Sequence, residues 1–219
     1  MKRRAFYLLG FLIVATAVPL SGAERDSASS ENSADRLEEM LLPMLQGEFA
    51  LQEGDSVTAA AAYVDAAERS TDVGLAERAT RIALLAEQPG LVERALRRWQ
   101  QLQPDALGAR QIELVLAIRD HRTSAAVHQL GVLLEGDKTA QSLAIQALAD
   151  AGENAVPVMQ QLLQEDFVPT SVDILVAIGA LASQSKADAL VDSTLRLAAQ
   201  RFPGDAKAIL WRVEVLQLK

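Results

Sequence analysis

Residues 59–71 read AAAAYVDAAERST, and this pattern returns at 92–104 (VERALRRWQQLQP) and at 191–203 (VDSTLRLAAQRFP). In each stretch a small or branched residue is followed by Tyr or Leu four positions later, and two of the stretches close on proline. The starting positions differ by one and by three steps of a period of about 33 residues, which indicates one supersecondary unit stacked several times. We call this interval the repeat step. The chain is therefore predicted to be a repeat array whose role is binding.

A second apolar pattern recurs at the same step between these stretches. Positions three and four apart share one face of a helix. Each unit is thus predicted to hold two amphipathic helices. The predicted fold class is all-α, an α-solenoid of about five helix pairs plus a C-terminal capping helix. The columns of this stripe are Gln46, Ala79, Ile112, Ile145, Ile178, Trp211, then Phe49, Ile82, Val115, Leu148, Leu181, Glu214, and Ala50, Ala83, Leu116, Ala149, Ala182, Val215.

Caps and helix-breaking residues set the predicted boundaries. Asp35 and Glu38 form a capping box for the first helix, Gly54 closes it, and Ser56 caps the second. Pro157 falls in the first turn of its helix, where a missing N–H is tolerated. The predicted helices cover residues 36–53, 56–69, 73–87, 90–102, 105–120, 123–135, 138–151, 154–165, 170–183, 186–201 and 205–218.

Two places in this array are expected to be irregular. The fourth unit fits worst, because it contains Pro157 and places Glu165 in a column that is apolar elsewhere. The last helix has no partner within its unit and is expected to act as a cap. In that role Trp211 covers the preceding pair while Arg212 and Glu214 face water.

The first 35 residues are predicted to lie outside the array, which covers residues 36–219. Basic residues 2–4 precede an apolar run over 5–20, and small residues occupy 21–23. This is the pattern of a signal peptide over residues 1–23, cleaved after Ala23. An uncleaved anchor is disfavoured by the short run and by Pro19 at its end. Residues 24–35 are polar and Ser-rich and are predicted to be a disordered leader.

Composition excludes several classes of function. The chain has no cysteine, so it has neither disulfides nor thiolate chemistry, and no cysteine follows the signal segment to carry a lipid anchor. The formal net charge is −8 and aromatic residues make up 4% of the chain, so nucleic-acid binding is not expected. The predicted location is the periplasm of a Gram-negative cell, in soluble form, with no stable membrane insertion after cleavage.

The spacing around Ala59, Tyr63 and Ala66, and around Leu195 and Pro203, resembles the tetratricopeptide repeat (TPR) family. Ankyrin arrays share the period, but their Thr-Pro-Leu-His signature is missing. The resemblance covers roughly residues 37–218 and implies a right-handed α-solenoid of TPR-like helix pairs. Residues 45–50, 75–83 and 98–105 look like the opening repeats of proteobacterial envelope TPR proteins. Some of those are adaptors of carboxyl-terminal processing proteases.

No catalytic constellation is recognisable in the sequence, and an enzyme is not expected. The two histidines, His121 and His128, are seven residues apart, which is not the spacing of a helical zinc site, and they are interpreted as surface residues. Residues 183–186 (SQSK) match a Ser-x-x-Lys pattern but lack its companion motifs. They are interpreted as part of a helix–helix turn. No metal or cofactor is predicted.

Function is therefore expected to reside in a surface. The resemblance implies that the first helix of each unit lines a concave groove. The candidate partner-binding residues in it are Glu48, Glu77, Arg81, Arg110 and Asp150. Their columns also contain Leu114, Ala117, Leu143 and Ala147. The arginines would pair with carboxylates of a peptide or partner helix. A plainer interpretation is that Glu77 and Arg81 form a surface pair within one helix.

The predicted function is a periplasmic scaffold or adaptor for an envelope protein or a protease complex. One alternative is a shortened or accessory relative of a longer array with no independent activity. Another is an envelope hydrolase acting on cell wall or peptide, in which Ser183 would be the nucleophile.

Overall fold

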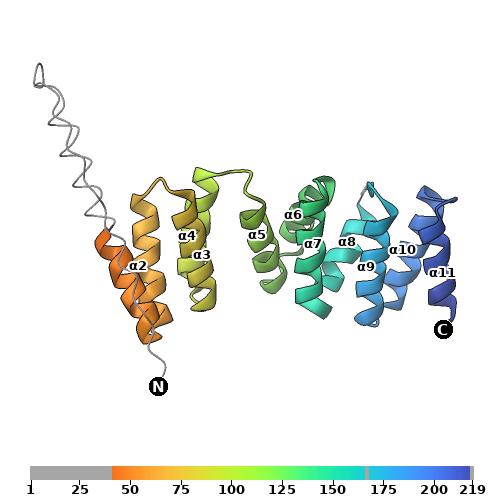
Figure 1. The fold of residues 1–219 in the computed structure, drawn as a ribbon. Helices are drawn as coiled ribbons and strands as arrows, with labels where there is room; N and C mark the ends of the chain where they lie inside the picture. Colours follow the sequence, from red (N-terminus) through yellow and green to blue (C-terminus); the bar gives the residue numbers. More distant parts are fainter. Residues whose placement is uncertain (1–40, 166–167, 218–219) are drawn as a thin grey trace, which may run out of the picture.

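The computed structural model describes residues 41–165 and 168–217, and every regular element in these ranges is helical. Helical residues 41–53 come first and Figure 1 shows the rest in a row. The helices that follow are α2 (Ser56–Arg69), α3 (Val73–Leu85), α4 (Pro89–Leu102), α5 (Leu107–Arg119), α6 (Thr123–Glu135), α7 (Lys138–Ala151), α8 (Val156–Gln164), α9 (Val172–Gln184), α10 (Asp188–Arg201) and α11 (Ala206–Gln217). The predicted signal peptide, the predicted leader and the predicted capping box at Asp35 and Glu38 lie outside the described residues.

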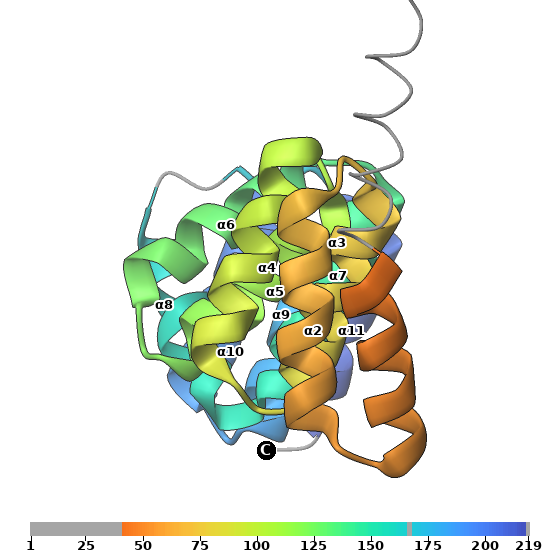
Figure 2. The ribbon, with the colours of Figure 1, turned by 90° about the vertical axis from the view of Figure 1, so that its left-hand side faces the viewer.

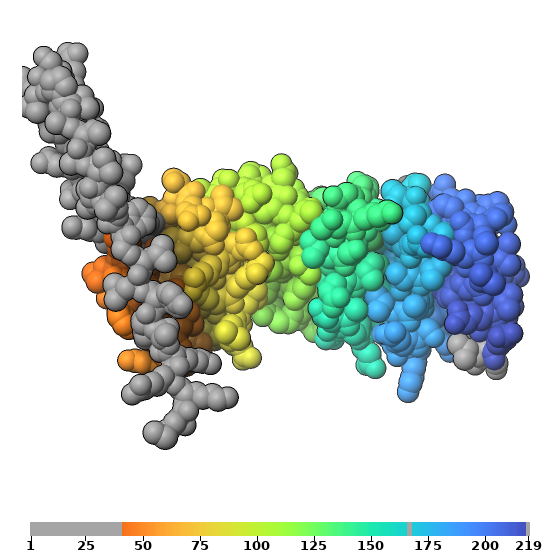
Figure 3. Space-filling model, in the orientation of Figure 1, coloured from red at the N-terminus to blue at the C-terminus, as the bar shows by residue number. Residues whose placement is uncertain are grey.

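The helices pack as consecutive pairs, and the pairs follow one another along the row. The paired helices are 41–53 with α2, α3 with α4, α5 with α6, and α9 with α10. In the fourth pair α7 and α8 both contact the short helix between them, and α8 packs on α6, while α11 has no partner of its own. In the view down the row, α6 and α8 lie toward one side and α3, α7 and α11 toward the other (Figure 2). The body is elongated, with residues 41–53 at one end and α11 at the other (Figure 3). The all-α prediction is confirmed.

Short polar caps start several of these helices. Asp55 accepts a hydrogen bond from the Thr58 backbone N–H at 3.0 Å, so Asp55 is the N-cap of α2. The assignment of that role to Ser56 was wrong by one residue, because Ser56 is already the first helical residue. Gly54 ends the preceding helix with a φ of 79°, a left-handed conformation that glycine adopts without strain.

The fourth pair is irregular, as its sequence predicted. A short 3₁₀ helix, Gly152–Ala155, joins α7 to α8, and α8 spans only nine residues. Pro157 lies in the first turn of α8, where its missing N–H removes no helical hydrogen bond. Glu165 lies just after the end of α8 and is exposed. Its carboxylate therefore stays in water, although the other units have an apolar residue at this repeat position.

Three aromatic side chains each pack against a glycine of a neighbouring helix. A Cβ on Gly47 would lie 2.6 Å from the Tyr63 ring, and one on Gly108 would lie 2.8 Å from the Trp99 ring. A Cβ on Gly179 would lie closer still to the ring of Trp211. Glycine is therefore required at these three positions for the helices to approach closely.

The core is divided along the row into three clusters. The first holds residues of the first two pairs and reaches Ala109 and Leu116 of α5. The second runs from Leu114 on the other side of α5 to Val191, and the third gathers around Trp211. Contact between the α3–α4 pair and α5 is sparse compared with contact inside the pairs. The joint between α4 and α5 therefore depends on few side chains, of which Trp99 is the largest.

The last helix covers the preceding pair through Trp211, which is buried among Val172, Leu175 and Ala198. Arg212 and Glu214 are exposed, as expected. The opposite side of α11, however, carries large apolar residues in contact with water, whereas a capping helix has a polar outer face. None of the helices in the described part of the chain combines the length and apolar character needed to cross a membrane.

Candidate functional site

A groove of about 920 Å³ lies between α7 and α9, the first helices of two successive pairs. Its size falls in the range of sites that hold small molecules or peptide segments. Ile145 and Ile174 supply large apolar side chains, with Ala149 and Ala177 beside them. The polar lining residues are Asp137, Lys138, Gln141, Ser142, Gln146, Thr170, Ser171 and Asp173.

Hydrogen bonds fix the polar rim of this groove. The amide of Gln141 donates to the backbone oxygen of Gly136 at 3.0 Å and to Thr170 Oγ1 at 3.3 Å, which joins α7 to the segment before α9. Asp137 caps α7 by accepting from the Ala140 N–H at 2.9 Å. Lys207 of α11 donates to Asp173 at 2.6 Å. The rim is thus organised before any ligand arrives, which lowers the entropy cost of binding.

The predicted groove residues at the start of the chain are engaged in local pairs. Glu48 accepts hydrogen bonds from the Tyr63 hydroxyl and from Arg78, the latter at 2.5 Å. Glu77 and Arg81 form an ion pair at 2.5 Å within α3. Glu77 and Arg81 thus have the geometry of a surface ion pair within one helix, and the Arg81 side chain remains largely exposed.

The two other predicted residues lie apart from this group. Arg110, in α5, contacts Asp105 at 3.4 Å and the Pro104 carbonyl at 3.4 Å. Asp150, near the end of α7, accepts from the Gln146 amide at 2.8 Å and does not line the groove between α7 and α9. The contacts of the five predicted residues thus place them in separate local arrangements.

The predicted inward columns are wrong for the middle of the array. Leu114, Ala117 and Ala147 are fully buried rather than groove-lining. The physical reason is that α5 packs on α7 and α7 packs on α9, and all three residues belong to the core cluster that these helices share. The groove is lined instead by Ser142 and Gln146, each one position earlier in the chain than the predicted Leu143 and Ala147. One residue corresponds to a rotation of about 100° around a helix.

Tyr63 is the buried centre of a small polar cluster where the helix over 41–53, α2 and α3 meet. Its side chain is fully buried, and the guanidinium of Arg78 lies 4.9 Å from the centre of its ring. Burial of the hydroxyl, together with its hydrogen bond to Glu48, raises the pKa of Tyr63 to about 12. The cluster connects the helix over 41–53 to α2 and α3, so its role in this geometry is to hold pairs together.

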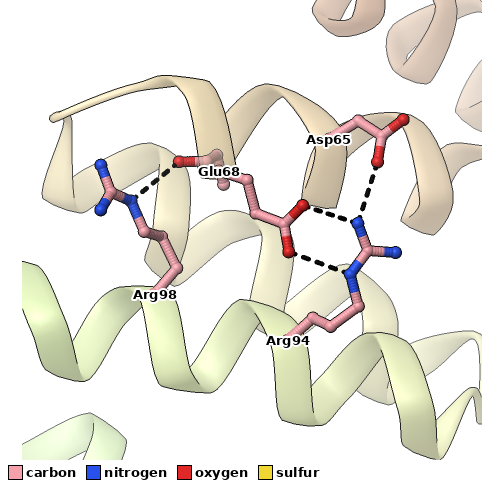
Figure 4. Close-up of polar contacts among 5 residues, drawn as sticks. Asp65, Glu68, Arg94 and Arg98 are labelled. Atoms are coloured by element: carbon pink, nitrogen blue, oxygen red, sulfur yellow. Dashed lines mark hydrogen bonds and ion pairs between the residues drawn. The ribbon is translucent and has the colours of Figure 1, made fainter.

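Sequence reasoning missed an ion cluster between α2 and α4 (Figure 4). Arg94 Nε and Nη2 donate to the two oxygens of Glu68 at 2.9 and 2.6 Å, and Nη2 also reaches Asp65 at 3.1 Å. The hydrogen bond from Arg94 lowers the pKa of Glu68 below its ordinary value, and Glu68 in turn raises that of Arg94. The two residues are 26 positions apart, seven fewer than the repeat step of about 33, so no pattern in the sequence pointed to this pair.

Arg98 adds a second contact between α4 and α2. Its Nη2 donates to the backbone oxygen of Ser70 at 2.5 Å, and its Nε donates to that of Ala67 at 3.3 Å. These carbonyls lie at the C-terminal end of α2, where backbone oxygens lack helical partners and a cation is favourable.

The residues considered for catalysis do not converge. Ser183 lies in the last turn of α9, and Lys186 lies in the turn that follows, with a φ of 55°. His128 is exposed on α6, whereas His121 lies in the turn after α5 and not on a helix. Among the residues that the structure describes, no cluster of three His, Cys, Asp or Glu side chains is arranged to hold a metal ion.

The chain was compared with protein families, curated protein sequences and solved structures. No protein-family model, no curated protein sequence and no solved structure matches the chain.

Proposed function

We propose that the chain is a non-catalytic interaction scaffold or adaptor. In this proposal its helix pairs form a right-handed TPR-like solenoid of five pairs plus a C-terminal helix. The packing of consecutive pairs and the regular repeat step support this architecture. The N-terminal segment would direct the chain to the periplasm, where its partner would be an envelope protein or a component of a protease complex.

The observation that carries the proposal is the groove between α7 and α9. It joins an apolar floor, which includes Ile145 and Ile174, to a rim whose side chains offer both donors and acceptors. An extended peptide or a partner helix is recognised by such a surface, because apolar anchors provide affinity and polar groups at the edge set orientation. Lys138 and Asp173 place opposite charges on the two helices that form the rim.

A peptide selection on the full chain tests this assignment. Random peptides displayed on phage are selected against the wild-type protein, and the recovered peptides are then measured against Ala149→Arg. Ala149 lines the groove and is exposed, so an arginine there fills the groove without disturbing the core. Binding by the recovered peptides is expected to fall about tenfold or more, since the apolar floor is covered by a charge.

The matched control is Ala61→Arg, which makes the same change at an exposed position of α2, away from the groove. Ala61→Arg is expected to bind the recovered peptides as the wild type does. The proposal fails if selection yields no binding peptide, or if Ala149→Arg and Ala61→Arg bind the selected peptides equally well.

A further inference from the structure

The groove between α7 and α9 follows α7 from Lys138, the first residue of that helix, to Ala149 (Figure 1). At 1.5 Å per residue this stretch is about 16 Å long, which is the length of a helix of about three turns. Both helices begin at the same end of the groove, because Gln141 of α7 bonds to Thr170 just before α9. We call the end at Lys138 the start of the groove and the end at Ala149 its far end.

The polar side chains along the middle of the groove already donate to the chain itself. The amide nitrogen of Gln141 donates to backbone oxygens and to Thr170. Ser142 Oγ donates to a backbone carbonyl one turn earlier at 2.8 Å, and the Gln146 amide donates to Asp150 at 2.8 Å. An extended peptide lying in the groove would therefore find few donors for its backbone carbonyls.

This shortage of donors favours a helix over an extended segment as the occupant. An extended segment carries an unpaired carbonyl at every residue, and each one that is turned into the groove loses water without gaining a partner. A helix pairs its own backbone groups, except for the first four N–H groups and the last four carbonyls. The apolar floor around Ile145 and Ala149 therefore suits the middle of a helix.

Donors without an ion pair or a capping role gather at the start of the groove. The Lys138 ammonium forms no ion pair with any side chain that the structure describes, and the Ser171 hydroxyl does not cap α9. Lys138 also lies in the first turn of α7, where a cation is unfavourable beside the positive end of the helix dipole. A negative group is therefore favoured here. The last turn of a helix supplies one through its unpaired carbonyls and its negative dipole end.

We infer that this groove binds an amphipathic partner helix of about three turns, antiparallel to α7 and α9, with its last turn beside Lys138. The inference rests on the proposed scaffold function and specifies the partner of the same groove. Apolar side chains of the partner, spaced at i, i+4 and i+7, lie over the small residues Ala149 and Ala177 at the far end. Its last carbonyls accept hydrogen bonds from Lys138 and Ser171.

Two peptide libraries displayed on phage separate a helical occupant from an extended one. Both are selected against the full chain and carry randomised apolar residues at the same positions. The helical library has an alanine-rich scaffold, whereas the extended library has proline at every third position, which prevents helix formation. Peptides that bind about tenfold or more weakly to Ala149→Arg, but normally to Ala61→Arg, are expected from the helical library only.

The extended library supplies the result that overturns the inference. Groove-dependent binders from that library, alone or with equal affinity to those from the helical library, show that the groove does not require a helix. The scaffold proposal survives that result. If neither library yields a groove-dependent binder, the inference fails, and the random-peptide selection decides separately whether the scaffold proposal fails as well.

Disulfide trapping tests the direction of the bound helix, because the chain contains no cysteine. Thr170→Cys and Ala149→Cys place a thiol at the start and at the far end of the groove, both at exposed positions. A helical binder with a cysteine at its C-terminal end is expected to crosslink to Thr170→Cys, and one with an N-terminal cysteine to Ala149→Cys. The opposite pattern, or equal crosslinking at both ends, contradicts the antiparallel direction.

The role of the Lys138 charge is tested by Lys138→Gln. Helical binders are expected to bind this variant about two- to fivefold more weakly, because the charge next to their last turn is removed. Lys186→Gln is the matched control, since Lys186 lies in the turn after α9 and does not line the groove. Equal affinity for the two variants contradicts the role assigned to Lys138.

Discussion

At the scale of single residues, the contact between Gly179 and Trp211 is the tightest that the structure describes at a glycine. We expect Gly179→Ala to lower the free energy of unfolding by about 1–3 kcal/mol, because the new methyl group must displace the indole ring. Gly131→Ala is the matched control. Gly131 lies inside α6 with open space around its Cα, so alanine there is expected to stabilise the protein by about 0.5–1 kcal/mol. Urea unfolding of both variants measures the difference, and equal effects would contradict it.

The buried hydroxyl of Tyr63 is expected to make the free energy of unfolding fall at alkaline pH. The folded protein holds the phenol proton with a pKa of about 12, against an ordinary value of 10.0. The folded state therefore binds this proton more tightly than the unfolded chain does. The contribution of Tyr63 is intact below about pH 10 and is lost as the pH rises toward about 12. The loss amounts to about 2–3 kcal/mol.

Tyr63→Phe isolates this effect. The variant keeps the ring against Gly47 but has no proton to lose, so its stability is expected to fall less steeply over the same pH window. Urea unfolding of both proteins at mildly and at strongly alkaline pH measures the two slopes. Identical slopes for the variant and the wild type would assign the alkaline loss to other groups.

At the scale of elements, Arg94 connects α2 to α4 through Glu68. Both side chains are about 40% exposed, so solvent screens the pair, and a double-mutant cycle of Arg94→Ala with Glu68→Ala is expected to give a coupling of only about 0.5–1 kcal/mol. The pKa of Glu68 is lowered in the folded protein, so the coupling is present at neutral pH and disappears as the pH falls through that value. A coupling that is unchanged in acid would contradict this assignment.

The elements also show what periodicity can and cannot predict. The repeat step located every helix with both ends described, because apolar stripes and breakers are local signals. It did not decide which residue caps α2, since Asp55 and Ser56 are both good caps and the backbone geometry selects between them. The repeat step also wrongly predicted that Leu114 and Ala147 line a groove, because their burial depends on how one pair packs against the next. The α7–α9 groove follows from that packing, which a repeat pattern does not encode.

At the scale of the whole molecule, the array is expected to respond to damage in sections. Contact between the first two pairs and α5 is sparse, and stability in a repeat array passes only between neighbours. Val64→Ala, a change in the buried core of α2, is expected to reduce amide protection in α2 to α4. Protection in α9 and α10 should change little. Hydrogen exchange read by mass spectrometry gives both values at once, and an even loss of protection along the chain would show a single cooperative unit.

The placement of the two tryptophans gives this chain built-in optical reporters. Trp99 lies at the joint between α4 and α5, and Trp211 lies between α9 and α11, so each indole belongs to a different joint. They are the only two tryptophans in the sequence. Replacing either one with phenylalanine leaves a single tryptophan, whose fluorescence follows one joint while the other joint has no tryptophan. Opening near the middle of the molecule and opening near its C-terminal end can therefore be timed separately, without attaching a dye.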